Sequence, residues 1–507
     1  MSHWPRPAIT RVTLSRRRFL ALATAATTAG PALGAAPAVA RASQPRRAAL
    51  GQTAAPDFAQ LVARVAALQQ EHQIPGVAIG VLHQGQEHVA GFGVTNADAP
   101  LPVDGDALFQ IGSNTKTYTM MALMRLVDQG RLELDAPVRR YLPELQLSDP
   151  EVAARVTLRH LLTHTSGLPA NLFVALGGGD DALARYVGEL ASLPLVLPLG
   201  LYPSYSNPAL SLAGRVLEVA TGLTYEAAVH DLVLDPLGMT RSFFFAADVI
   251  RYAATVGHLL VDEQPRVLRP WAFPRTANAA GGLVSSVRDQ LRYARCWLGE
   301  GTAPDGTRLL SPAALAQIQT VQSSEPGGLG KFGLSWALAD VGGIAGIQHT
   351  GGTVGQESLL YIVPERGFAL CVLTNLLGGG AILGPVLEWA QEHYLGVPPA
   401  PPPEPTPLAL SAAELAAYAG RYANPGEMEY TLTVHNGGLQ LQGRLTDPYM
   451  DQVQPQPPAD APVQVAFAER DELYAVEAPA ARGSFLRYAD GRLRGLFWGG
   501  RFNVRLD

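Results

Sequence analysis

The chain has 507 residues, more than one hydrophobic core usually supports, so two or more domains are expected. Hydrophobic residues make up 47% and charged residues 16%, a composition that excludes an intrinsically disordered protein. A net charge of −6 without a basic stripe argues against nucleic acid as a partner.

The first 42 residues are typical of an export signal. Arg16 and Arg17 belong to a twin-arginine pattern, and a mild run of alanine, threonine and glycine follows. This run is too weakly apolar to predict a membrane-spanning helix, and a disordered alanine-rich tail is the alternative. Cleavage after residue 42 would remove six arginines and no acids, so the net charge of −6 would become −12. We therefore expect an acidic mature protein, periplasmic or extracellular, with no integral membrane span.

Residues 43–56 read as a flexible lead-in, and residues 57–396 form the largest predicted domain. Hydrophobic periodicity predicts strands near both ends of this domain and helices in its middle. The expected helices are 58–72, 117–129, 158–162, 209–221, 225–233 and 286–298, and the expected strands are 76–82, 88–95, 357–363 and 367–374. A sheet built from both ends of the domain predicts an α+β fold.

A proline-rich segment, 397–408, separates this domain from the rest of the chain. Proline lacks the backbone N–H and fixes φ, so the segment is expected to be a stiff, extended linker. Residues 409–507 carry short alternating strands and turn signals such as Asn436-Gly437, which predict a small antiparallel barrel or sandwich. We find no nucleophile with a base in this tail. Three roles are open for this C-terminal domain: it covers an active-site cleft, it binds a partner, or it only stabilises the chain.

Lysine is rare in this chain: of 38 basic residues, only Lys116 and Lys331 are lysines. Lysine can lose its proton when it is removed from water, whereas arginine cannot. Ser113 lies three residues before Lys116 at the predicted start of a helix, so both side chains share one face. The helix N-terminus favours negative charge on the serine oxygen, and the amine can accept the serine proton. Alone, the pattern equally fits an N-cap serine followed by an exposed lysine.

Tyr205 and Asn207 lie in a loop rich in proline and serine, just before a predicted helix. A neighbouring ammonium would lower the phenol pKa, which makes Tyr205 a candidate general base. The Asn207 amide is a candidate ligand for a substrate carbonyl. An ordinary helix-entry loop with a packed tyrosine is the alternative.

A third pattern, residues 349–352, follows an apolar segment late in the domain. Its glycines allow close approach of a backbone, and the N–H of Gly352 can join that of Ser113 to form an oxyanion hole. His349, Thr350 and Gly351 are candidate substrate contacts. A glycine-rich hairpin turn is the alternative.

Together and in this order, the three patterns resemble the S-x-x-K, Y-x-N and [KH]-[TS]-G motifs of the serine β-lactamase and penicillin-binding-protein superfamily, in its class C-like branch. The resemblance covers residues 58–394, with similar flanking segments at 109–112, 156–169 and 280–286. It implies a β-lactamase/transpeptidase-like fold, an antiparallel sheet flanked by helices with an all-helical region, followed by a small all-β domain. It also implies that Ser113 is the acylated nucleophile, Lys116 its proton partner and Tyr205 the base, with no metal or organic cofactor.

The branch contains several kinds of hydrolase, and His349 bears on the choice between them. Class C β-lactamases carry lysine at this position, whereas DD-carboxypeptidase and D-peptidase members carry histidine. No arginine lies between Lys331 and His349 to bind a terminal carboxylate. The resemblance therefore implies an exported esterase, D-amino-acid peptidase or DD-carboxypeptidase, acting on a small ester, a peptide or a peptidoglycan-derived substrate. A penicillin- or peptidoglycan-binding module without turnover and a true β-lactamase are the alternatives.

Overall fold

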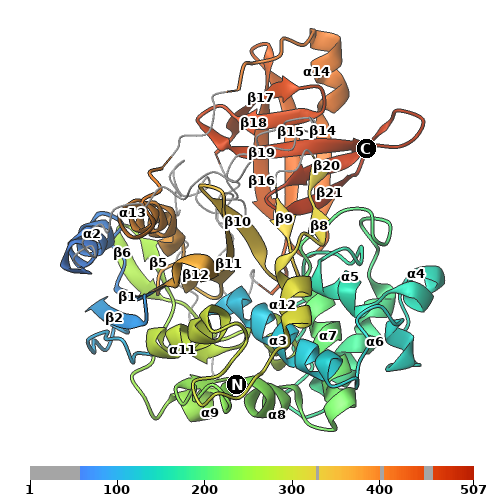
Figure 1. Ribbon diagram of the computed structural model, residues 1–507. Coiled ribbons are helices and arrows are strands. Elements are labelled where there is room, and N and C mark those ends of the chain that lie inside the picture. Colours follow the sequence, from blue (N-terminus) through green and yellow to red (C-terminus); the bar gives the residue numbers. More distant parts are fainter. Residues whose placement is uncertain (1–57, 327–329, 400–404, 450–460) are drawn as a thin grey trace, which may run out of the picture.

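The computed structural model describes residues 58–326, 330–399, 405–449 and 461–507. The predicted signal and lead-in lie outside these residues, as does part of the proline-rich linker. An eight-stranded antiparallel sheet organises the larger domain, in the order β2-β1-β13-β12-β11-β10-β9-β8 (Figure 1). Its strands are β1 Gly76–His83, β2 Gln86–Gly93, β8 Ser323–Ser324, β9 Lys331–Phe332, β10 Ala337–Val341, β11 Ile344–Gly352, β12 Glu357–Val363 and β13 Phe368–Thr374.

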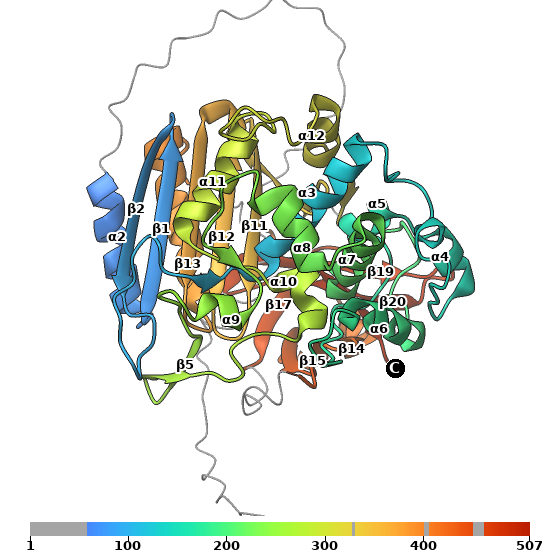
Figure 2. The same cartoon turned by 90° about the horizontal axis from the view of Figure 1, so that it is seen from below.

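Helices cover both faces of this sheet. The helices α2 (Phe58–Glu71) and α13 (Leu383–Leu395) pack on one face, and α11 (Val287–Leu298) packs on the other, as Figures 1 and 2 show. Every residue of β12 and β13 is buried as a result. Strands covered on both sides need no polar face, which is why the sequence of both strands is mostly apolar, with polar residues only at Glu357, Ser358 and Thr374 near one end.

A helical region lies beside the sheet, centred on α3 (Thr115–Asp128). Eleven of the fourteen residues of α3 are buried, so this helix forms the centre of the larger hydrophobic core. The other helices of the domain are α4 Pro150–Arg155, α5 Leu158–Leu162, α6 Ala182–Glu189, α7 Asn207–Thr221, α8 Tyr225–Val229, α9 Ala246–Val249, α10 Asn278–Gly281 and α12 Pro312–Gln319. Two small sheets complete it, with strands β3 Phe109–Gln110, β4 Ser242–Phe243, β7 Val284–Ser285, β5 His258–Val261 and β6 Gln264–Val267.

Several boundaries differ from the sequence prediction, and local hydrogen bonds explain the differences. The helix predicted from residue 209 begins at Asn207, because the Ser206 side chain caps it by accepting a bond from the Ala209 N–H and proline occupies its first turn. The β1–β2 hairpin turns at Gln84 and Gly85, both with positive φ, so β2 starts two residues earlier than expected. The strands β8 to β11 were not predicted; β8 and β9 have two residues each, whereas β11 has nine.

The C-terminal residues form a closed barrel of eight strands, preceded by α14 (Ala412–Tyr418). Its strands are β14 Gly420–Asn424, β15 Met428–His435, β16 Gly438–Leu445, β17 Val463–Glu469, β18 Glu472–Ala475, β19 Ala478–Arg487, β20 Leu493–Trp498 and β21 Arg501–Arg505. This arrangement confirms the predicted α+β fold followed by a small all-β domain.

The barrel is bonded to the larger domain through buried groups. The Asn424 side chain accepts a hydrogen bond from the Ala170 N–H at 2.7 Å and donates one to the Phe502 carbonyl at 2.9 Å. Val196 and Leu197 of the larger domain pack against Phe502.

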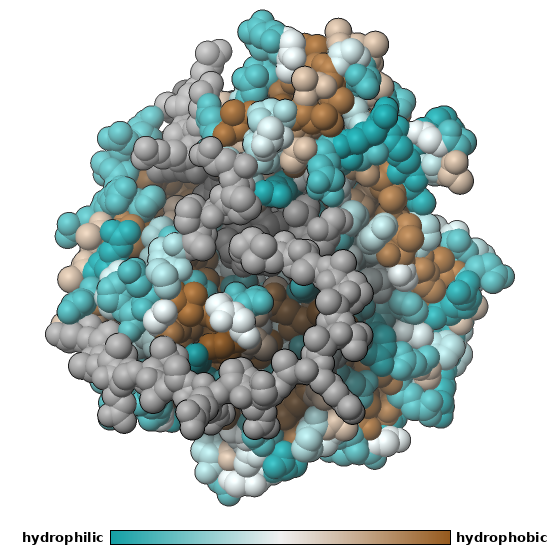
Figure 3. Space-filling model, turned by 45° about the horizontal axis from the view of Figure 1, so that its top comes forward, coloured by the Kyte–Doolittle hydropathy of each residue, from teal (hydrophilic) through white to brown (hydrophobic). Residues whose placement is uncertain are grey.

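Hydrophobic residues gather in a hollow near the centre of the face drawn in Figure 3, while the margin of that face is largely hydrophilic. Among the described residues, no helix has the length and apolarity needed to cross a membrane.

Candidate active site

Ser113 lies in a tight turn that leads into α3. Gly112 has a φ of +52°, which favours glycine, and residues Gly112–Asn114 form one turn of 3-10 helix before α3 begins. Lys116, one turn further on, is completely buried, and its Nζ lies 3.0 Å from Ser113 Oγ. The same Nζ donates a hydrogen bond to the Ala280 carbonyl at 2.7 Å, which fixes its position. The predicted serine–lysine pair is therefore in direct contact.

Tyr205 reaches the same point from the loop before α7. Its ring centre lies 4.7 Å from Lys116 Nζ, and its phenol interacts with the Ser113 hydroxyl. His164 supports the loop from behind: its Nδ1 accepts a hydrogen bond from the Ser206 N–H at 3.1 Å, and its ring packs against Tyr205 with centroids 4.4 Å apart. Lys116 and Tyr205, which are far apart in the sequence, thus meet at the Ser113 hydroxyl.

Removal from water determines the protonation of these groups. Burial lowers the pKa of Lys116 well below its usual value, and the positive charge of Arg501 lowers it further. Burial also raises the pKa of Tyr205, against the opposing effects of the Ser113 hydroxyl and Arg501. The positive charge acts in the direction expected from the sequence, but burial outweighs it. The phenol is protonated at neutral pH, and the amine is the group driven towards the neutral, proton-accepting form.

The end of β11 lies against the serine turn. A Cβ atom added to Gly351 would stand 2.0 Å from the Ile111 carbonyl oxygen and 2.8 Å from the Ser113 nitrogen. A Cβ added to Gly112 would stand 2.7 Å from the Gly352 nitrogen. Only glycine permits this approach, which brings the Gly352 backbone beside the turn that carries Ser113.

His349, on the same strand, is neutral in this setting. Burial, and then the charge of Lys116, lower its pKa to about 3. Its Nδ1 lies 2.5 Å from the Thr350 carbonyl oxygen, so Nδ1 carries the proton and Nε2 is the acceptor. The strand therefore offers a neutral hydrogen-bonding group and no fixed cation at this position.

Asn207 is placed differently from the other predicted residues. It is the first residue of α7, and its side-chain amide donates a hydrogen bond to Asn171 Oδ1 at 2.6 Å. It does not belong to the residues that line the cavity at Ser113. Its role as a carbonyl ligand stays a prediction.

The cavity at Ser113 has a volume of about 250 Å³. Predicted residues on its wall are Ser113, Tyr205, His349, Thr350, Gly351 and Gly352; further wall residues include Leu162, His164, Glu325, Lys331, Phe332, Trp336, Gly499, Gly500 and Arg501. Polar groups around the serine thus face an apolar and aromatic surface, as is usual in substrate sites.

The C-terminal barrel supplies part of this wall, which sequence reasoning missed. The turn between β20 and β21 is bonded to the Tyr205 loop: the Tyr205 N–H donates to the Gly500 carbonyl at 3.1 Å, and the Phe502 N–H donates to Ser204 Oγ at 3.1 Å. Arg501 places its guanidinium 5.0 Å from the centre of the Tyr205 ring and pairs with Glu427 at 2.5 Å. A glycine pair before an arginine is the only sequence signal of this turn, and nothing in it indicates that the turn reaches a distant serine.

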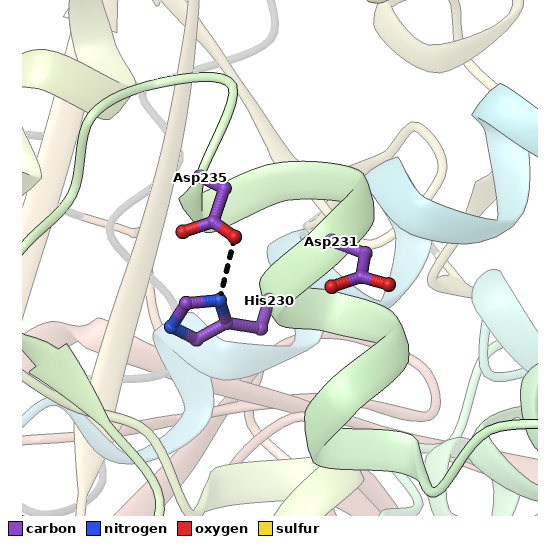
Figure 4. Close-up of side chains that lie close together, drawn as sticks. All are labelled: His230, Asp231 and Asp235. Atoms are coloured by element: carbon purple, nitrogen blue, oxygen red, sulfur yellow. Dashed lines mark ion pairs between the residues drawn. The ribbon is translucent and has the colours of Figure 1, made fainter.

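One group outside the cavity has the geometry to hold a metal ion: His230, Asp231 and Asp235 (Figure 4). All three side chains are exposed, and His230 Nδ1 lies 3.0 Å from Asp235 Oδ2. A surface ion pair accounts for this arrangement. The group therefore gives no reason to expect a metal ion.

Comparisons with known proteins agree with this geometry. A family model described as Beta-lactamase matches residues 61–391. Penicillin-binding protein 4 of Amycolatopsis lactamdurans is 34% identical, over 73% of this chain and 98% of its own length. Esterase EstB of Burkholderia gladioli is 37% identical, over 63% of this chain and 91% of its own length. Among solved structures, SurE covers 88% of this chain and 98% of its own, with a TM-score of 0.69 and 26% identity, and a second structure contains SurE with D-Leu.

Proposed function

Because this chain belongs to the β-lactamase family, we propose that it cleaves an ester or amide bond through an acyl-enzyme on Ser113. At the level of the family it is a serine hydrolase related to β-lactamases and penicillin-binding proteins. The observation that carries the proposal is the 3.0 Å contact between Ser113 Oγ and the buried amine of Lys116. A pure binding module has no need of a serine-activating amine.

In the acylation step, Ser113 Oγ attacks the carbonyl carbon of the substrate and its proton passes to Lys116 Nζ. Lys116 can accept it because burial lowers the pKa of the amine. The backbone N–H groups of Ser113 and Gly352 stabilise the negative charge on the carbonyl oxygen. Tyr205, protonated at rest, donates a proton to the leaving group and is reprotonated from Lys116.

Deacylation repeats these steps with water as the nucleophile. The Lys116–Tyr205 pair accepts a proton from the water, which attacks the acyl carbonyl in the same oxyanion hole. The tetrahedral intermediate collapses with return of a proton to Ser113 Oγ, and the acid is released. No metal or organic cofactor takes part in this scheme.

The substrate class is proposed from the wall of the cavity and from the relatives. EstB is named as an esterase, and SurE has been crystallised with D-Leu, which supports esters and D-amino-acid amides or peptides. The neutral His349 gives no fixed cation for the carboxylate of a β-lactam. Arg501 brings a guanidinium to the wall from the barrel, where it pairs with Glu427. A substrate with a free carboxylate has to compete with Glu427 for this guanidinium, so a peptidase for such substrates is the second candidate.

Initial hydrolysis of p-nitrophenyl butyrate by the mature protein tests the proposal. We expect turnover by the wild type, loss of at least three orders of magnitude in Ser113→Ala, and no change in Ser192→Ala, an exposed serine outside the cavity. Mass spectrometry of the quenched reaction should find the acyl group on the peptide that contains Ser113. Equal rates in wild type and Ser113→Ala would eliminate Ser113 as the nucleophile. Stoichiometric acylation without turnover would identify the binding module, and faster turnover of penicillins than of esters or D-amino-acid amides would identify a true β-lactamase.

We also propose that the protein is exported through its twin-arginine signal to the periplasm or the medium. The support is the pattern around Arg16 and Arg17, followed by a mild apolar run. Replacing both arginines by lysine should retain the unprocessed protein in the cytoplasm of the host. Export at the wild-type rate would contradict the proposal.

A further inference from the structure

A second ionisable side chain, which the mechanism does not use, lies in the wall of the Ser113 cavity. Glu325 follows β8 and is only 7% exposed. It lines the same cavity as Ser113, Tyr205 and His349. Acidic residues are seldom this buried without a partner, because removing a carboxylate from water costs free energy.

The Glu325 carboxyl lies close to Gly330 and Phe332. A Cβ added to Gly330 would stand 3.1 Å from Glu325 Oε2 and 3.0 Å from the Phe332 ring, so the carboxyl and this aromatic side chain both lie beside the chain at Gly330. The Glu325 backbone N–H donates to the Gly330 carbonyl at 2.9 Å. Within the described ranges, no hydrogen bond or ion pair reaches the carboxyl itself. Burial alone raises its pKa to about 7.

Among the described residues, no cation of the wall pairs with Glu325. Arg501 pairs with Glu427, and Lys331 is exposed to solvent. Lys116 lies beneath the wall, in contact with Ser113 and Ala280. A carboxyl that is buried in a substrate cavity, and that no described protein group satisfies, is matched by a partner that enters with the ligand.

We infer that Glu325 binds a positively charged amino group, so that the cavity prefers molecules that carry an ammonium over neutral molecules of the same shape. An ammonium is the complement of this site because it donates hydrogen bonds and supplies the charge that keeps the carboxyl ionised. Phe332 and Trp336, on the same wall, receive the apolar part of such a ligand. The inference rests on the proposed function only in taking this cavity as the substrate site.

Direct binding tests this inference without any turnover, so its failure is separate from a failure of the proposed function. The probes are 4-phenylbutylammonium and its neutral counterpart 4-phenyl-1-butanol, titrated calorimetrically into the full-length mature protein at pH 8. We expect the wild type to bind the ammonium about tenfold or more tightly than the alcohol, the range of a hydrogen bond to a charged group. Glu325→Gln should lose this preference. Glu144→Gln, an exposed acid outside the cavity, should keep it.

The pH dependence gives a second measurement on the unmodified protein. The other titratable or charged side chains on the wall are His164, Tyr205, Lys331, His349 and Arg501. The pKa values of both histidines are lowered well below neutrality and that of Tyr205 is raised, so Glu325 is the carboxyl that ionises near pH 7. Preference for the ammonium should therefore rise between pH 6 and pH 8. No preference in the wild type, a preference that survives in Glu325→Gln, or one that is constant across this range would overturn the inference.

Discussion

The barrel residue Arg501 allows a quantitative test of how the two domains share the active site. Lys116 Nζ and the Arg501 guanidinium lie 4.7 and 5.0 Å from the centre of the same Tyr205 ring. The two cationic groups are therefore at most about 10 Å apart. At an effective dielectric constant of 20, two unit charges about 10 Å apart interact by about 1.7 kcal/mol, or just over one pKa unit.

Replacing Arg501 by methionine should therefore raise the pKa of Lys116. A repulsive charge that disfavours the ammonium form is removed, and the amine holds its proton more tightly. Catalysis needs the neutral amine, so the acidic limb of the kcat/KM profile should move by about one unit to higher pH. On that limb, activity at a fixed pH should fall about tenfold. Glu427 loses its partner in this variant, and any negative charge it keeps acts in the same direction.

The assay is kcat/KM for p-nitrophenyl butyrate between pH 5 and pH 10. Arg501→Lys retains the charge and should show a smaller shift. Arg494→Met, on β20 of the same barrel but outside the cavity wall, should show none. A limb that stays in place or moves to lower pH in a folded Arg501→Met protein would refute the electrostatic coupling.

Three further predictions concern packing and stability. Gly351→Ala places a Cβ 2.0 Å from the Ile111 carbonyl, so we expect a lower melting temperature and at least a tenfold loss of kcat, whereas Gly352→Ala, whose Cβ meets nothing within 4 Å, should melt like the wild type. In Glu325→Gln, the free energy of unfolding should exceed that of the wild type at pH 8 by up to about 3 kcal/mol and match it at pH 4. The sign follows because the pKa of Glu325 is higher in the folded than in the unfolded state, so wild-type stability is lost as pH rises from about 4.5 through about 7. Chemical denaturation of both proteins at pH 4 and pH 8 measures the difference in their free energies of unfolding. A difference that is the same at both pH values would contradict the prediction. Asn424→Ala removes one buried hydrogen bond across the domain interface and one within the barrel, and should cost about 2–3 kcal/mol in guanidinium unfolding; a loss below 0.5 kcal/mol would show that neither contact stabilises the fold.

Much of the fold could be predicted because its signals are local. The run from Phe368 to Leu373 is apolar throughout, as is typical of a strand that is buried on both faces. The helix start at Asn207 was misplaced by two residues because the Ser206 cap and the proline in the first turn were not weighed against hydrophobic periodicity. The strands β8 and β9 have two residues each, too few for any period to appear.

The site was predictable only in part, for a different reason. Ser113 and Lys116 are one helical turn apart, so their contact follows from helix geometry. The protonation of Tyr205 depends on the balance between burial and neighbouring positive charge, and a sequence does not display burial. Arg501 and Glu325 reach the cavity through tertiary packing, and neither belongs to a spaced pattern that would have singled it out.

The turn between β20 and β21 has a consequence for how such enzymes diversify. Gly499, Gly500 and Arg501 form part of the wall of the Ser113 cavity, yet they belong to a barrel with a hydrophobic core of its own. Insertions, deletions or substitutions in this hairpin reshape the pocket without disturbing the helix that carries Ser113 and Lys116. Because the same turn contacts the Tyr205 loop and carries the Arg501 charge that acts on Lys116, exchanging barrels between relatives should change both the substrate range and the pH dependence of an otherwise unchanged Ser113–Lys116 pair.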